Sequence, residues 1–112
     1  MSDPTSAVSE ILERGGDADD VLRDVVSALA QLPDVSWAGI AFVEDGALRL
    51  GPGAGREDEA RRVRTPVSFQ GTPVGELWVD GAVSAEDLSR VTMLLAPLVL
   101  IGWDTGGEAW EP

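Results

Sequence analysis

The sequence predicts an α+β fold in which helices pack on an antiparallel sheet. Three observations predict it: an amphipathic helical pattern over residues 17–32, two pairs of strand-like segments each joined by a short turn, and an apolar helix from residue 84. Runs of strands bounded by helices are typical of sheets that carry helices on one face. With 112 residues the chain forms one domain, which buries roughly two thirds of its unfolded surface.

The amino-acid composition excludes several kinds of catalytic and metal-binding site. Apolar residues make up 44% of the chain, which is too many for a disordered protein. The chain has no cysteine and no histidine, so thiol nucleophiles, cysteine metal sites and the commonest general base are excluded. We therefore expect no catalytic residue, no metal and no cofactor, and we expect that the protein is not an enzyme.

The charge is strongly negative, because twenty Asp and Glu face eight Arg and the net charge is −12. Such a charge repels nucleic-acid phosphates and anionic membranes, so neither is an expected partner. The acidity favours solubility, although a high-salt cytoplasm or a basic partner would also explain it. The N-terminus lacks the features of a signal peptide and residues 93–103 are too few to span a bilayer, so we expect a cytoplasmic protein.

The N-terminal part contains two helical segments. Residues 1–16 are expected to form an N-terminal helical arm, which a pair of glycines ends. The next helix starts after Asp17, which forms a capping-box-like pair with Asp20, and it stops before Pro33. One stripe of this helix is apolar and predicts its core face: Val21, Leu22, Val25, Val26, Leu29 and Leu32.

The first hairpin follows. Residues 35–43 are apolar at both alternations, which predicts a central strand covered on both faces. An Asp-Gly turn at residues 45–46 pairs it with a strand over residues 47–50. Residues 51–62 are rich in glycine and then charged, so they are expected to form an exposed loop with one helical turn.

The second hairpin joins residues 63–69 to residues 74–80. Pro66 cannot donate a backbone hydrogen bond, so the first of these strands is expected at a sheet edge. Alternation divides the last strand between two faces: Gly75, Leu77 and Val79 face the helices, and Glu76, Trp78 and Asp80 face away from them.

The last helix has a well-defined start, because Ser84 and Asp87 form a capping box. Its inner stripe is expected to comprise Leu88, Val91, Leu94, Leu95 and Leu98. Nearly every position from 93 to 103 is apolar, which is more than one sheet can cover, and Pro97 is expected to disturb the helix interior. The compact domain is expected to span residues 17–103, and residues 104–112 to form a flexible tail.

The segments RTPVSF, QGTP and VGELWVDG at residues 64–81, followed by the helix that begins SAEDL, resemble the closing segment of GAF domains. The resemblance covers residues 21–103. It implies a sheet of about four strands in the order 2-1-4-3, with the N- and C-terminal helices packed on one face. A roadblock or longin-like module is the rival fold, but it requires a full helix where residues 51–62 leave room for a turn or two.

Within that family, WAGIAFVEDGALRLGP and GELWVDG are most similar to the branch of free methionine sulfoxide reductases. This resemblance implies that Trp37 forms part of a pocket wall and that Asp80 helps to bind a substrate, whereas Trp78 replaces a second acidic residue. The catalytic cysteines have no counterpart, and the segment that would carry them and roof the pocket is missing. We therefore expect no reductase activity.

Alternation places Trp37 beside Trp78 on the open face of the sheet, with Glu76 and Asp80 next to them. Three interpretations stay open: the tryptophans are core residues, they bind a small or cationic ligand, or a partner covers them. Four arginines lie close by in the sequence, and they are expected to pair with loop carboxylates, with anion binding as the alternative: Arg56, Arg61, Arg62 and Arg64.

The sequence thus supports two hypotheses about function. The first is a non-catalytic GAF-like regulatory or protein-interaction module that is homodimeric through its terminal helices. Its expected dimer interface comprises Met93, Leu94, Leu98, Ile101 and Trp103. The alternative is a small-molecule-sensing GAF domain that binds its ligand on the Trp37/Trp78 face.

Overall fold

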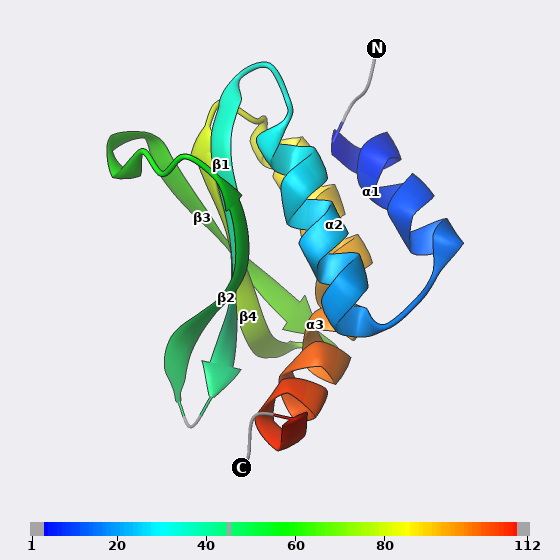
Figure 1. The fold of residues 1–112 in the computed structure, drawn as a ribbon. Coiled ribbons are helices and arrows are strands. Elements are labelled where there is room, and N and C mark those ends of the chain that lie inside the picture. The colour runs from blue at the N-terminus through cyan, green and yellow to red at the C-terminus, as the bar shows by residue number, and fades with distance from the viewer. Residues whose placement is uncertain (1–3, 45, 110–112) are drawn as a thin grey trace.

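The computed structural model describes residues 4–44 and 46–109, with side chains described except at residue 44 and residues 101–109. A four-stranded sheet forms one layer, α2 and α3 cover one of its faces, and α1 packs against these two helices on the side away from the sheet (Figure 1). The elements follow in the order α1 (Pro4–Arg14), α2 (Ala18–Ala30), β1 (Val35–Glu44), β2 (Ala47–Gly55), a 3-10 turn η1 (Glu59–Arg61), β3 (Arg62–Phe69), β4 (Thr72–Gly81) and α3 (Ala85–Ala109).

The strands are antiparallel throughout and lie in the order β2-β1-β4-β3, as the sequence predicted. The two hairpins therefore meet in the middle of the sheet, where β1 pairs with β4. Strand β3, which carries Pro66, lies at an edge and needs no backbone donor there.

Strand β2 is longer than the sequence predicted. We expected it to end at residue 50, but it pairs with β1 as far as Gly55. This part of β2 is rich in glycine because the aromatic side chains of β1 lie against its backbone. A Cβ atom at Gly51 would collide with the ring of Phe42, and one at Gly53 would lie 3.0 Å from the ring of Trp37. The glycines thus continue a strand that side chains would have disrupted.

The two long helices start in different ways. The Oγ atom of Ser84 accepts a hydrogen bond from the backbone N–H of Asp87 at 3.1 Å, which confirms the predicted cap of α3. Asp17 occupies the N-cap position of α2 with extended backbone, but its side chain makes no capping hydrogen bond, so the predicted capping box was wrong there. The carboxylates of the first turn, Asp19 and Asp20, still lie at the positive end of the helix dipole.

The core lies between the sheet and the helix layer. Leu77 and Val79 of β4 are fully buried, and Gly75 lets the backbone of β1 and the side chain of Val99 come close. Helix α1 belongs to this core, because its Val8 and Ile11 are also buried. From α2 and α3 the buried apolar side chains are Val21, Leu22, Val25, Val26, Leu29, Leu88, Val91, Leu95, Ala96 and Val99.

Helix α3 continues through Pro97 and past residue 103, where the sequence placed the end of the domain. Pro97 has no N–H, so the carbonyl of Met93 lacks its usual helical donor. Within the residues that the structure describes, no helix is long and apolar enough to cross a membrane.

Candidate functional site

The open face of the sheet, opposite the helices, brings together the four side chains that the sequence singled out there. The strand pairing places Arg62, Asp80 and Trp37 opposite one another across β3, β4 and β1. The next row on this face consists of Arg64, Trp78 and Gly39, and Glu76 follows with Ala41. Residues that are directly opposite on antiparallel strands share a face, so these side chains are neighbours.

Trp37 lies flat against the sheet at the centre of this group. Added Cβ atoms would meet its ring at Gly39 of the same strand and at Gly53 of β2, so the ring covers both glycines. Only 5% of the Trp37 surface is exposed. Because the two glycines have no side chains, they leave space in which the indole ring lies against the backbone in one orientation.

Arg62 and Asp80 form a two-point ion pair beside this ring. The distances are 2.7 Å from Nε to Oδ1 and 2.9 Å from Nη2 to Oδ2. Asp80 is fully buried and accepts a further hydrogen bond from the backbone N–H of Asp58 at 2.6 Å. The Arg62 side chain keeps 14% of its surface exposed and also donates to Glu57 at 3.0 Å. Every charge in this buried pair is thus matched by hydrogen bonds.

The two arginines also stack on the tryptophans. The guanidinium carbon of Arg62 lies 4.6 Å from the ring centre of Trp37 and 5.3 Å from that of Trp78. Arg64 lies 4.7 Å from the ring centre of Trp78. These distances are within the range of cation–π attraction.

Glu76 completes the outer part of the cluster. Its Oε1 atom accepts hydrogen bonds from Arg64 Nε at 2.7 Å and from Trp78 Nε1 at 2.8 Å. Arg64 is about half exposed, so this outer pair is more hydrated than the inner Arg62–Asp80 pair.

The electrostatics of the inner pair follow from these contacts. The hydrogen bonds from Arg62 lower the pKa of Asp80, and the backbone donor at Asp58 lowers it further, while burial opposes both effects. The hydrogen bond to Asp80 likewise raises the pKa of Arg62. Asp80 is therefore a stable carboxylate and is unsuited to the exchange of protons near neutral pH.

The sequence interpretation missed the role of Arg62 and Arg64. It assigned both to a solvated cluster paired with loop carboxylates, and the contact between Arg62 and Glu57 agrees with that assignment. The main partners of Arg62, however, are Asp80 and the two tryptophans. Alternation along β3 could have revealed this, because residues 62 and 64 share the face of their β4 partners.

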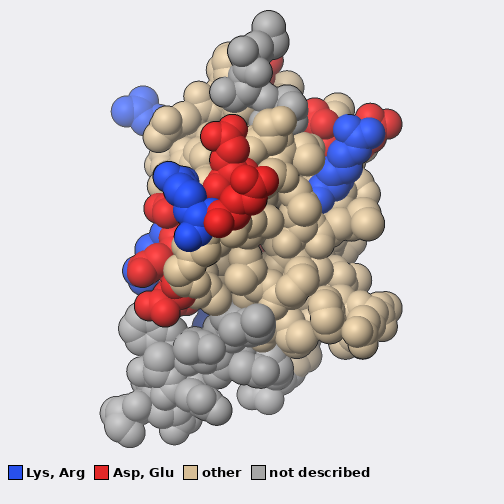
Figure 2. Space-filling model, turned by 90° about the vertical axis from the view of Figure 1, so that its right-hand side faces the viewer, with Lys and Arg blue, Asp and Glu red and all other residues tan. Residues whose placement is uncertain are grey.

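The expected dimer interface lies on the other layer of the molecule. Met93 is 74% exposed, whereas Leu94 and Leu98 are partly buried and pack against the core, in agreement with the predicted inner stripe of α3. The side chains of Ile101 and Trp103 lie outside the described residues. Residues 91–103 carry no charge. Seen from the helix side, charged side chains lie over the upper part and the left edge of the surface, and the centre and lower right are uncharged (Figure 2).

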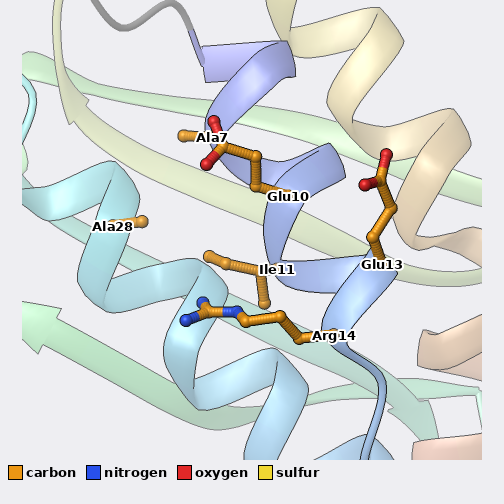
Figure 3. Close-up of a pocket in the computed structure, with 6 residues that line it drawn as sticks. All are labelled: Ala7, Glu10, Ile11, Glu13, Arg14 and Ala28. Atoms are coloured by element: carbon orange, nitrogen blue, oxygen red, sulfur yellow. The ribbon is translucent and has the colours of Figure 1, made fainter.

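A pocket of about 620 Å³ opens between α1 and α2. It is lined by Ala7, Glu10, Ile11, Glu13, Arg14 and Ala28. Arg14 extends from α1 toward α2, whereas Glu13 lies on the side of α1 that faces away from α2 (Figure 3). The charged lining groups thus do not converge on a common point. Among the described residues, no group of three or more acidic side chains is placed to hold a metal ion.

Comparison with known proteins identifies the architecture. No protein-family model matches the sequence, and no curated protein is significantly similar to it. The GAF domain of the phosphoenolpyruvate-protein phosphotransferase of Acinetobacter matches the structure with a TM-score of 0.67 at 15% identity, over 95% of this chain and 98% of that one.

Two reductase structures match as well. The type II free methionine-R-sulfoxide reductase of Thermoplasma acidophilum has a TM-score of 0.54 at 24% identity, over 74% of this chain and 95% of its own. The fRMsr of Staphylococcus aureus, solved in complex with its substrate, has a TM-score of 0.63 at 15% identity, over 86% of this chain and 93% of its own. Identities this low establish the fold alone. Together with the strand order and the packing of α2 and α3 on one face of the sheet, these matches show that the chain has a GAF-like fold.

Proposed function

We propose that this protein is a non-catalytic regulatory or protein-interaction module that works as a homodimer through α3. The observation that carries the proposal is the uncharged, outward surface of α3, where Met93 is 74% exposed in a chain of net charge −12. Apolar surface of this kind is typical of an interface.

The charge distribution supports self-association at this place. Two copies that each carry −12 repel one another, so a contact is least unfavourable where acidic side chains are absent. Residues 91–103 are such a stretch, and it is long enough to contribute several helical turns to an interface. A two-fold contact would bring Met93, Leu94 and Leu98 against the same residues of a second copy.

The open face supports the non-catalytic part of the proposal. Both oxygens of its buried carboxylate, Asp80, accept hydrogen bonds from Arg62. A general base must be able to reach and accept a substrate proton, which such a pair does not favour.

The test is a matched pair of substitutions on opposite layers. Met93→Asp places a charge on the α3 surface, whereas Leu50→Asp does the same at the open-face side of β2, where Leu50 is 48% exposed. Light scattering at micromolar concentration is expected to give a dimer for the wild type and for Leu50→Asp, and a monomer for Met93→Asp. Dissociation by both substitutions, or by Leu50→Asp alone, would argue against an interface on α3.

A second candidate function is small-molecule sensing on the open face. The observation that favours it is the cluster of Trp37, Trp78 and Asp80, which combines aromatic rings and a carboxylate in one place. The similar S. aureus protein was solved with its substrate, which makes a small ligand a reasonable class for this fold. Tryptophan fluorescence that changes on ligand addition would support this function, and a signal unchanged across a broad set of metabolites would oppose it.

A further inference from the structure

Arg62 is held on the open face in the way that a bound ligand would be held. Its guanidinium group stacks on two rings and makes a two-point contact with a buried carboxylate. We propose that Trp37, Trp78 and Asp80 form a guanidinium-binding site, which Arg62 occupies in the free protein and from which an external guanidinium group can displace it. The inference rests on the second candidate function and does not depend on the α3 dimer.

The site matches the shape and charge of a guanidinium group. Guanidinium is planar and presents parallel N–H donors, which suit the two oxygens of one carboxylate, and its flat face stacks on indole. Asp80 supplies the two acceptors, and Trp37 and Trp78 supply the aromatic faces. A compact ammonium group can neutralise the carboxylate but cannot make the two-point contact or the flat stack, so the site favours guanidinium over ammonium.

The walls of the site are held by contacts that do not involve Arg62. The backbone N–H of Asp58 donates to Asp80 Oδ2 at 2.6 Å, and Ser36 Oγ donates to the backbone carbonyl of Asp80 at 3.3 Å. Trp37 lies over Gly39 and Gly53, which have no side chains to displace it. These contacts are expected to keep the carboxylate and the ring in place when Arg62 leaves, so the site is pre-organised.

Arg62 also has an alternative position. It is the first residue of β3, an edge strand, and part of its side chain reaches solvent. Glu57, which already accepts from Nη2, and Glu59, whose Oε2 lies 4.0 Å from Nη1, are both largely exposed. A displaced Arg62 can therefore stay paired at the surface, and no buried charge is left without a partner.

The test uses Arg62→Ala, which removes the occupant and leaves Asp80 in place. Methylguanidinium is titrated at millimolar concentration, far below the molar range in which guanidinium denatures proteins, and tryptophan fluorescence reports binding. The variant is expected to bind at least about tenfold more tightly than the wild type, because the wild-type site is open for only a small fraction of the time. Methylammonium at the same concentration controls for ionic strength and charge.

Two further variants make the result specific. Arg64→Ala removes the outer arginine, so it is expected to bind methylguanidinium as weakly as the wild type. The double variant Arg62→Ala/Asp80→Asn lacks the carboxylate and is expected to lose the binding gained by Arg62→Ala. If Arg62→Ala is unfolded in buffer, methylguanidinium is expected to restore its near-UV circular dichroism, and methylammonium is not.

The proposal is overturned if Arg62→Ala binds methylguanidinium no better than Arg64→Ala does, or if an unfolded Arg62→Ala is not restored. N-acetyl-arginine amide distinguishes the source of the group: binding of this compound to Arg62→Ala indicates an arginine of a partner protein, and binding of methylguanidinium alone indicates a small free molecule. Light scattering of the same samples keeps the two proposals apart, because loss of the dimer changes the mass and not the guanidinium selectivity.

Discussion

Asp80 holds Arg62 over the indole ring of Trp37: the two side chains meet at 2.7 Å and 2.9 Å, and the guanidinium carbon lies 4.6 Å from the ring centre. Through this contact Arg62 covers part of the sheet face opposite the helices, where the sequence pattern placed the two tryptophans. It joins three strands through their side chains, because Arg62 lies on β3, Asp80 on β4 and Trp37 on β1.

Removal of the carboxylate is expected to destabilise the protein. Asp80→Asn leaves the guanidinium of Arg62 without its buried partner, at a cost of about 2–4 kcal/mol in the free energy of unfolding. The expected cost is smaller than for a fully buried ion pair, because Arg62 can turn toward Glu57 at the surface. Urea unfolding measures the change, and Glu76→Gln is the control, since its exposed pair with Arg64 is worth about 0–1 kcal/mol. Equal losses in the two variants would contradict the assignment of Asp80 as the main anchor.

The contribution of Asp80 is expected to depend on pH in one direction. The pKa of Asp80 is lowered in the folded state, so the unfolded state binds its proton first as the pH falls. The stabilisation is therefore complete above about pH 4, the ordinary range for an Asp in an unfolded chain, and is lost as the pH falls toward the folded pKa. The difference in stability between wild type and Asp80→Asn should be constant from pH 6 to about pH 5 and smaller at about pH 3. A difference in stability that grows as the pH falls would contradict a lowered pKa of Asp80 in the folded state.

Gly39 is expected to tolerate no side chain, because a Cβ atom there would collide with the ring of Trp37. Gly39→Ala should cost about 1–3 kcal/mol and alter the near-UV circular dichroism of the indole. Gly53→Ala is the matched variant on β2, where the new Cβ would lie 3.0 Å from the edge of the same ring, so a smaller cost is expected. A larger cost for Gly53→Ala than for Gly39→Ala would mean that the ring is not seated as described.

The starts of α2 and α3 provide a comparison of capping. Ser84→Ala removes a side-chain hydrogen bond to the N–H of Asp87 and should cost about 1 kcal/mol of stability. Asp17→Ala removes no such bond, so only the interaction of its charge with the helix dipole is lost, a few tenths of a kcal/mol. Thermal unfolding of the two variants should rank them in that order, and the reverse order would contradict the described caps.

Local patterns predicted the fold well where each element depends on its own residues. The pairing of β1 with β2 in a hairpin, the capped start of α3 and the alternation along β4 each depend on a few residues, and the structure confirms them. The strand order followed from the resemblance to GAF domains, and the solved structures support it.

The parts that the sequence did not predict depend on contacts between distant residues. The extension of β2 to Gly55 requires the rings of Phe42 and Trp37, which lie on another strand. The position of Arg62 requires Asp80, which is eighteen residues away in the chain. A charged residue beside a glycine-rich segment is usually a solvated loop residue, and only the strand register reveals that Arg62 lies over the tryptophans.

The central claim, a dimer formed through the uncharged surface of α3, is tested most directly by the solution mass of the wild-type protein. Sedimentation equilibrium at micromolar concentration is expected to give a mass of twice 11.8 kDa that returns to 11.8 kDa in Met93→Asp. A wild-type mass of 11.8 kDa at every concentration would contradict the claim.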